Sequence, residues 1–412
     1  MTPGRVRLDD YVAVIGEPAV AEIRALARRL EGRQVCMVNS TAVGGGVAEL
    51  LNRLVPLLAD VGIPVRWEVM RGGDEFFGVT KAMHNALHGA PAEITPAMLE
   101  LFLEVNAQNG ASLDLAADLV VIHDPQPVAL VRTRPGRSGR WVWRCHVDVS
   151  RPRAEVWDFL RQFVEQYDAS VFSAPEFTQV LPITQYMIHP AIDPLAEKNR
   201  DMSATESKEI LHRLGIRDDR PIVTQVSRFD RLKDPVGVIR AYQLARRTVD
   251  CQLVLAGGGA TDDPEGALVL EEVRRAADGD PLIHILELPP FSDREINALQ
   301  RASAVVVQKS LREGFGLTVT EALWKRRPVI ASAVGGIPLQ VVHNLTGLLV
   351  HSVEGTAHRI RTLLRDPEFA RRLGENGHEY VKTRFLTTSN LRHWLALSLS
   401  LLHPGERVIR LP

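Results

Sequence analysis

The chain has 412 residues, of which 45% are apolar and 24% are charged, a composition typical of a soluble globular protein with more than one domain. Its 49 Lys and Arg residues balance 50 Asp and Glu residues, and no window holds five or six like charges, which argues against nucleic acid and membrane surfaces as partners. Cys36, Cys145 and Cys251 are too few and too widely spaced for a disulfide framework or a C-x-x-C metal site, and no signal peptide is evident. We therefore expect a cytoplasmic protein.

The first half of the chain alternates short β-branched runs with longer helical patterns, as parallel βαβ units do. We expect strands at residues 34–39, 65–69, 119–123 and 142–145. We expect helices at residues 47–60, 75–87, 95–109 and 152–167. Residues 190–202 contain two prolines and mixed charges and are interpreted as a linker, so the first domain covers residues 1–190.

A second series of the same kind follows the linker and forms a second domain, residues 191–387. After a helix at 203–214 we expect strands at residues 222–226, 253–256, 283–286, 304–307 and 329–332. Ser292 and Glu295 have the spacing of a capping box. A terminal helix at 388–402 has leucines four residues apart and should pack back on the first domain. The pattern predicts two doubly wound, Rossmann-like α/β domains facing each other across a cleft.

Ligands of such sheets bind at the carboxyl ends of the strands, where this sequence has unusual residues. Arg228 and Lys233 follow one strand, and Asp234 and Pro235 fit the N-cap and first position of the next helix. A diphosphate would find two cations and free backbone amides at that helix start. Taken alone, two cations on a loop are more often solvated surface charges.

Glycine-rich turns follow other strands, at residues 44–46 and 257–259, and glycine lets the backbone approach a ligand closely. Neither the turn at 257–259 nor the loop at 308–318 has the dinucleotide or P-loop fingerprint. Glu313 and Glu321 flank seven residues that run from a glycine-rich loop into a helix. Carboxylates at such places accept hydrogen bonds from paired sugar hydroxyls, although Glu321 alone would fit a solvated helix face.

His123, Asp124, His146 and Asp148 end two strands of the first domain and could be read as metal ligands. Zinc sites of this type need H-x-H or H-E-x-x-H spacing, which is absent, so we predict no protein-bound metal. There is no G-x-S-x-G elbow to support Ser/His/Asp catalysis.

Taken together, these motifs resemble a known family. Ser227, Arg228 and Lys233, the turn at 257–259, E-G-F-G-L at 313–317 with Glu321, and V-G-G-I-P at 334–338 are similar to the retaining nucleotide-sugar glycosyltransferases of the GT-B fold, which include sucrose synthase and glycogen synthase. In the first domain, V-N-S-T at 38–41, H-D-P-Q-P at 123–127 and R-C-H-x-D at 144–148 narrow the resemblance to the trehalose glycosyltransferring synthases. Their relatives, the trehalose phosphorylases, are much longer chains.

The resemblance implies a role for each of these residues. Arg228 and Lys233 would hold the donor diphosphate as it leaves, Glu313 would accept from the 3-hydroxyl of the donor glucose, and Glu321 from the ribose. His146 would lie beside the 6-hydroxyl and the reacting face of that sugar, although a histidine at a strand end is often structural. Donor-binding residues would further include Gly45, Gly257, Gly258, Gly316, Leu317 and Thr318. The acceptor glucose would contact Asn39, Gly46, Lys81, Asp124, Gln126 and Asp148.

The implied reaction transfers glucose from ADP-glucose or UDP-glucose to the anomeric hydroxyl of free glucose and forms α,α-trehalose with retention. Retention fits the lack of an obvious carboxylate pair, because the leaving diphosphate can itself take the acceptor's proton. Only Lys81 adds positive charge at the acceptor site, so free glucose is expected rather than a glucose phosphate.

We expect no tightly bound cofactor, and Mg²⁺ would do no more than assist the diphosphate. The partners would be small-molecule substrates, and the sequence leaves the choice between monomer and homodimer open. One alternative is a phosphorylase that uses glucose 1-phosphate. Another is a non-catalytic sugar-nucleotide-binding module, which should have lost some of Arg228, Lys233, Glu313 and Glu321, yet all four are present.

Overall fold

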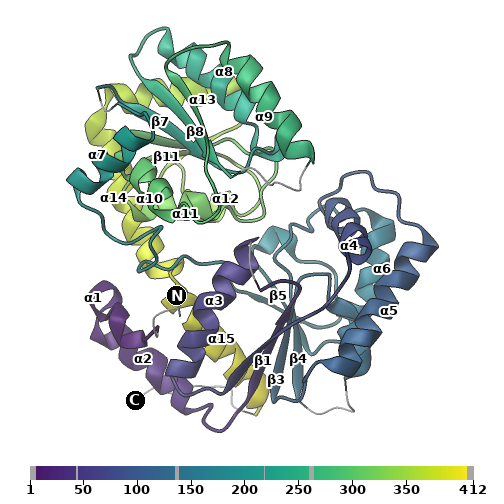
Figure 1. Ribbon diagram of the computed structural model, residues 1–412. Helices are drawn as coiled ribbons and strands as arrows, with labels where there is room; N and C mark the ends of the chain where they lie inside the picture. The colour runs from purple at the N-terminus through teal and green to yellow at the C-terminus, as the bar shows by residue number, and fades with distance from the viewer. Residues whose placement is uncertain (1–5, 43–44, 135–138, 218, 259–263, 406–412) are drawn as a thin grey trace. The chain divides into compact units, whose positions relative to one another are not determined.

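The computed structural model describes residues 6–42, 45–134, 139–217, 219–258 and 264–405, which form two compact units (Figure 1). Unit 1 comprises Met1–Pro190 and Thr387–Pro412, and unit 2 comprises Ala191–Leu386. Each unit holds a six-stranded sheet in which every strand pair is parallel. The predicted fold class, doubly wound α/β, is confirmed. In the described part of the chain, no helix has the length and apolar character that a bilayer crossing requires.

The sheet of unit 1 has the strand order β2-β1-β3-β4-β5-β6. Its strands are β1 (Val35–Asn39), β2 (Val65–Val69), β3 (Leu119–His123), β4 (Arg140–Arg144), β5 (Ala169–Phe172) and β6 (Thr184–Met187). Helices near one face are α2 (Glu17–Arg28), α3 (Gly45–Asp60) and α15 (Thr387–Leu402), preceded by the short α1 (Val12–Ile15). Helices near the other face are α4 (Asp74–Leu87), α5 (Pro96–Ser112) and α6 (Ala154–Val164).

The central strands β1 and β3 are buried on both faces, which explains why they are almost entirely apolar rather than alternating. On β4, Val142 belongs to the core that includes residues of α3 and α15, whereas the neighbouring Trp143 packs against Trp157 of α6. On α15, Leu391, Leu395 and Leu399 belong to that same first core, so the last helix of the chain completes unit 1.

The sheet of unit 2 has the strand order β12-β11-β10-β7-β8-β9. Its strands are β7 (Ile222–Val226), β8 (Gln252–Gly257), β9 (Ile283–Glu287), β10 (Val305–Gln308), β11 (Val329–Ser332) and β12 (Leu348–Val350). One core packs β7 and β8 against α8 (Pro235–Arg246), α9 (Pro264–Ala277) and α13 (Val353–Arg365). A second core lies against α7 (Ala204–Arg213) and α10 (Asp293–Ala302). The remaining helices are α11 (Leu317–Trp324), α12 (Ile337–Gln340) and α14 (Pro367–Arg384).

Two helix starts test the local predictions. Asp234 is the N-cap of α8, as predicted, and its side chain accepts a hydrogen bond from the Gly237 amide at 3.0 Å. The capping box at α10 is wrong, because the Ser292 hydroxyl donates instead to the Pro289 carbonyl at 2.8 Å. The preceding turn places that carbonyl closer to the hydroxyl than the helix amides.

The glycines after β8 differ in how tightly the chain packs around them. A Cβ on Gly257 would lie 1.9 Å from the Ser227 carbonyl oxygen, directly beside the turn that carries Arg228. A Cβ on Gly258 would first meet the Leu288 carbonyl oxygen at 3.5 Å, an ordinary contact. Glycine at 257 therefore lets β7 and β8 end side by side.

We expect Gly257→Ala to lower the free energy of unfolding by about 1–3 kcal/mol, because the added methyl group must push the Ser227 backbone away. The matched variant Gly258→Ala adds the same methyl group where there is room for it. Urea unfolding of both variants and the wild type measures the difference. Equal stability of the two variants would contradict the close approach.

Candidate functional site

An ion pair between Lys233 and Glu313 forms the centre of the candidate site in unit 2. Lys233 ends a short 3₁₀ turn, η4 (Arg231–Lys233), between β7 and α8, and Glu313 lies in the loop between β10 and α11. The Lys233 Nζ atom is 2.6 Å from the Glu313 Oε2 atom, and the two side chains are only 19% and 9% exposed. The fold thus brings together two of the predicted catalytic residues that are far apart in the sequence.

The Glu313 carboxylate is oriented by two further donors that sequence analysis did not identify. The Ser310 hydroxyl donates to Oε2 at 3.1 Å, and the Gln308 amide lies 3.5 Å from the same oxygen and 3.0 Å from the Ser310 hydroxyl. Within the described residues, no hydrogen bond uses the other oxygen, Oε1. One carboxylate oxygen is therefore fixed by the protein, and the second can accept a hydrogen bond from a ligand hydroxyl.

The backbone around Glu313 is held by the glycines that follow β11. Gly335 has a φ of +53°, and a Cβ on it would lie 1.6 Å from the Glu313 carbonyl oxygen. The Gly336 amide donates to the Gly314 carbonyl at 3.1 Å. Gly316, with a φ of +84°, is the N-cap of α11, which Leu317 and Thr318 begin. These contacts place the predicted donor-binding backbone next to the Glu313 carboxylate.

The turn between β7 and α8 carries Arg228, which is exposed and whose Nη2 atom lies 3.4 Å from an Asp230 carboxylate oxygen. Asp234 closes the turn with a φ of +47°, and its carboxylate accepts from the Gly237 amide of α8 and binds Lys309. Lys309 was not predicted. It is a buried cation directly after β10, and its own strand-end position is the signal that could have identified it.

Glu321 lies on α11 and is 3% exposed. The Lys198 Nζ atom is 3.8 Å from its Oε1 atom and 3.7 Å from an Asp293 carboxylate oxygen. Lys198 comes from the segment that the sequence indicated to be a linker. This carboxylate is thus held inside a charged cluster, as a binding residue would be, rather than on a solvated helix face.

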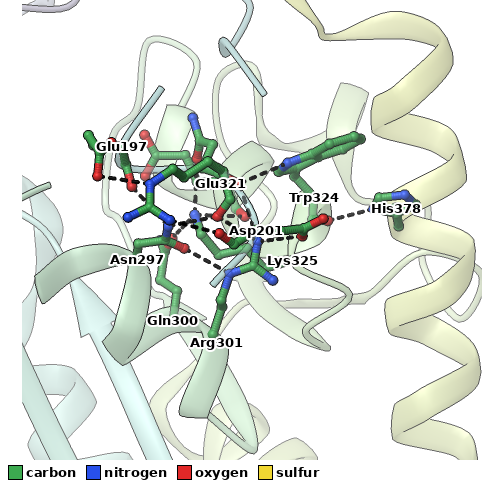
Figure 2. A network of polar contacts seen from close by, with 11 residues as sticks. Glu197, Asp201, Asn297, Gln300, Arg301, Glu321, Trp324, Lys325 and His378 are labelled. Atoms are coloured by element: carbon green, nitrogen blue, oxygen red, sulfur yellow. Dashed lines mark hydrogen bonds and ion pairs between the residues drawn. The ribbon is translucent and has the colours of Figure 1, made fainter. Parts of the chain in front are cut away.

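The segment 190–202, which the sequence indicated to be a linker, runs between β6 and α7, and side chains of α10 and α11 bind its backbone (Figure 2). The Asn297 amide donates to the carbonyls of Glu197 and Arg200, each at 2.9 Å. The Arg301 guanidinium donates to the Arg200 carbonyl at 2.9 Å, and the Trp324 indole to the Asn199 carbonyl at 3.2 Å. Side chains therefore supply the hydrogen bonds that regular secondary structure would otherwise provide.

A buried lysine completes this network. Lys325, 3% exposed, donates to the side-chain oxygens of Asn199 at 3.0 Å and Gln300 at 2.7 Å and to the Glu321 carbonyl at 3.4 Å (Figure 2). Burial lowers the pKa of Lys325 to about 7, and the nearby Glu321 carboxylate opposes this shift. Lys325 thus connects residues 190–202 to α10 and to the helix that carries Glu321.

In unit 1, predicted residues gather at the ends of β3 and β4. The Asp124 carboxylate accepts a hydrogen bond from the His146 amide at 2.8 Å, and burial raises the pKa of Asp124 to about 6. The His146 Nε2 atom is 3.0 Å from the Nδ1 atom of His123. Asp148 follows closely and accepts from the Ser150 amide at 2.9 Å.

The other predicted acceptor residues lie in separate loops and helices of unit 1. Asn39 uses both ends of its side chain within the protein, donating to the Thr41 carbonyl at 2.7 Å and accepting from the Trp67 indole at 2.8 Å. The Gln126 Oε1 atom is buried and has no hydrogen-bond donor among the described residues. Lys81 is exposed on α4.

Gly45 and Gly46 begin α3, whereas Gly44 and Gly259 of the predicted glycine turns lie outside the described residues. Gly257 ends β8, and Gly258 follows it. Among the described residues, there is no group of three or more His, Cys, Asp or Glu side chains that could bind a metal ion.

Lys325→Met should remove a pH dependence of stability. The unfolded chain keeps the Lys325 proton up to about pH 10, whereas the folded chain releases it near pH 7. Between these values the unfolded state binds more protons, so Lys325 makes the free energy of unfolding rise with pH, by up to about 1.4 kcal/mol per unit.

Urea unfolding at about pH 7 and about pH 9 measures this contribution. The free energy of unfolding of the wild type minus that of Lys325→Met should be larger at the higher pH. The exposed Lys208 on α7, changed to Met, controls for the loss of one positive charge. A difference that stays constant with pH would contradict the assignment.

Comparison with known proteins finds matches to both halves of the chain. Residues 37–179 match the family model described as trehalose synthase, N-terminal domain, and residues 206–380 match the model for glycosyl transferases group 1. A trehalose synthase of Pyrococcus horikoshii is 45% identical over 404 residues and 97% of each chain. One of Rubrobacter xylanophilus is 44% identical over 414 residues, covering 98% of this chain and 99% of its own. The structure of a sucrose-phosphate synthase from Thermosynechococcus elongatus, 21% identical, shares the fold with a TM-score of 0.69 over 90% of this chain and 100% of its own.

Proposed function

Since the chain belongs to the trehalose synthase family of glycosyltransferases and has the GT-B fold, we propose that it transfers glucose from ADP-glucose or UDP-glucose to free glucose. The product is α,α-trehalose, and the configuration at the transferred anomeric carbon is retained. No tightly bound cofactor is part of the proposal, and Mg²⁺ would enter only with the diphosphate. The partners are these small molecules.

The observation that carries the proposal is the 2.6 Å contact between Lys233 and Glu313. In a nucleotide sugar, the diphosphate and the sugar hydroxyls lie within a few bonds of the anomeric carbon. A cation for the phosphates and a carboxylate oxygen for a hydroxyl must therefore lie side by side. The pair meets this requirement, because Ser310 and Lys233 hold Oε2 and leave Oε1 to accept from the sugar.

Glu321 supports the proposal that the donor sugar carries a nucleotide. A buried carboxylate accepts two hydrogen bonds from neighbouring hydroxyls, and ribose offers such a pair. Lys198, 3.8 Å away, contacts this carboxylate, and Lys325 donates to the Glu321 backbone carbonyl. A carboxylate held in this way recognises the ribose without reading the base, which fits a donor carrying either adenine or uracil.

The chemical step needs no carboxylate pair. The anomeric hydroxyl of the acceptor attacks C1 of the donor glucose on the face from which the diphosphate leaves. The C1–O bond to the diphosphate breaks as the new C1–O bond forms, and a phosphate oxygen takes the acceptor's proton. Lys233 and Arg228 stabilise the negative charge that develops on the leaving diphosphate, a contribution that is larger in the transition state than in the bound substrate.

The acceptor is proposed to bind in unit 1, near Asp124 and Gln126. The Gln126 Oε1 atom lacks a donor among the described residues, and the Asp124 backbone has a φ of +68°, a strained conformation that is common in binding sites. Lys81 is the one predicted acceptor residue with a positive charge, whereas a phosphate would call for a cluster of Arg and Lys. Free glucose therefore fits this set of residues better than glucose 6-phosphate.

Lys233→Ala should lower kcat by roughly 10²–10³, because a charge-assisted contact to the departing diphosphate supplies about 2–4 kcal/mol of transition-state stabilisation. Arg231→Ala is the matched control, since Arg231 lies on the same turn but its guanidinium is bound to Glu272. Steady-state kinetics of both variants test the role. Near-normal turnover of Lys233→Ala would contradict it.

The decisive experiment offers ADP-glucose, UDP-glucose or glucose 1-phosphate with glucose or glucose 6-phosphate and identifies the product by proton NMR. We expect α,α-trehalose from a nucleotide glucose and free glucose, with release of the nucleoside diphosphate. Trehalose made only from glucose 1-phosphate would indicate a phosphorylase. A strong preference for glucose 6-phosphate would indicate a trehalose-phosphate synthase, and nucleotide binding without turnover would indicate a non-catalytic module.

A further inference from the structure

Two histidines of unit 1 form a hydrogen-bonded pair that the reaction scheme above does not use. His123 ends β3 and is fully buried, and His146 follows β4 and is partly exposed. The His123 Nδ1 atom lies 3.0 Å from the His146 Nε2 atom, and the rings are nearly parallel, with an angle of 17°. The other His123 nitrogen, Nε2, lies 3.4 Å from the Met37 sulfur. Met37, His123 and His146 therefore form a chain that runs outward from the core.

The backbone holds this chain in place at both strand ends. The Asp124 amide donates to the Arg144 carbonyl at 2.7 Å, and the Asp124 carboxylate accepts from the His146 amide at 2.8 Å. The Trp143 indole donates to the Asp124 carbonyl at 2.9 Å. The two imidazoles thus have little freedom to separate.

Both rings are expected to be neutral near pH 7. Burial, together with the buried Arg144 guanidinium, lowers the pKa of His123 to about 3 and the pKa of His146 well below its usual range. A neutral imidazole carries one N–H, so one of its nitrogens donates and the other accepts. The 3.0 Å contact between the rings then holds a single proton, and the tautomers of the two histidines depend on each other.

Met37 decides which of the two possible arrangements forms. Its thioether sulfur can only accept, and His123 Nε2 faces it, so His123 carries its proton on Nε2. The His123 Nδ1 atom is then an acceptor, and His146 must donate to it from Nε2. The remaining nitrogen of His146, Nδ1, is left with a lone pair, and no hydrogen bond within the described residues uses it.

We propose that Met37 and His123 are positioning residues that fix His146 in the tautomer whose Nδ1 atom is a hydrogen-bond acceptor, and so prepare this histidine for the sugar hydroxyl that the family resemblance implies for it. The second part of this inference rests on the proposed function. His123 is a positioning residue, and His146 is the group that contacts substrate. In this tautomer His146 orients a hydroxyl and does not donate a proton to the leaving group.

The tautomer can be measured without any substrate, from the side-chain nitrogen shifts of protein labelled with ¹⁵N-histidine, with His123→Leu and His146→Asn used to assign the signals. We expect the Nε2–H form for both histidines in the wild type. Met37→Leu keeps the packing but removes the acceptor, so it should produce a mixture of tautomers at His123. An Nδ1–H form of His146 in the wild type would overturn the proposal.

The role in catalysis is tested by two substitutions at His123. The side-chain oxygen of His123→Asn can accept from His146 as the imidazole does, whereas His123→Leu cannot. We expect kcat to fall by about tenfold or more in His123→Leu, with a much smaller change in the KM for the nucleotide sugar, and to recover in His123→Asn. Equal kcat values for the Leu and Asn variants would refute the positioning role.

These outcomes are separable from failure of the proposed function. If the wild type forms no trehalose but His146 is the Nε2–H tautomer, the proposed reaction is wrong and the positioning of His146 by Met37 and His123 is right. If trehalose forms and His146 is the Nδ1–H tautomer, the proposed positioning is wrong and the proposed reaction is right.

Discussion

The ion pair between Lys233 and Glu313 is the interaction on which the arrangement of unit 2 depends. Either charge alone, so little exposed, would cost several kcal/mol to remove from water, and each one compensates the other. The two residues lie in different loops, so the pair fixes the β7–α8 turn against the β10–α11 loop. Lys309 binding Asp234 and Gly335 packing on the Glu313 backbone reinforce the same junction. Stability and ligand recognition thus use the same atoms.

A second layer supports this junction through helix α11. Its buried Glu321 and Lys325 bind a segment that has no regular secondary structure, and the Trp324 ring stacks on His378 of α14 at 4.4 Å. Because Asn297, Gln300 and Arg301 all come from one helix, α10, the irregular segment is positioned by rigid elements. A binding carboxylate supported in this way loses little conformational entropy when a ligand arrives.

The fold was predictable because both series of strands are apolar runs separated by helical patterns. Strands β5, β6 and β12 were missed. The sequences of β5 (Ala-Ser-Val-Phe) and β6 (Thr-Gln-Tyr-Met) are short and carry few β-branched residues, and β12 has only three residues. Among the site residues, Glu313 and Lys233 belong to recognisable motifs. Lys309 has only its place directly after a strand as a signal. Ser310 and Lys198 have none, because ordinary polar residues acquire a role only through contacts that folding creates. The packing of residues 190–202 could not be predicted for the same reason: their binding partners lie about a hundred residues away.

The helix that closes unit 1 is synthesised after the whole of unit 2. On the ribosome, α15 emerges only once residues 191–386 have been made, which at about 5–20 residues per second takes roughly 10–40 s. During that time the face of the unit 1 sheet that carries Met37 and Val121 lacks Leu391, Trp394 and Leu395. Unit 2, whose two ends meet at the bridge between Ile192 and Leu386, has all of its own core by then. Translation order therefore completes the sequence of unit 2 before that of unit 1, and until α15 is made the first half of the chain lacks the helix that covers one face of its sheet.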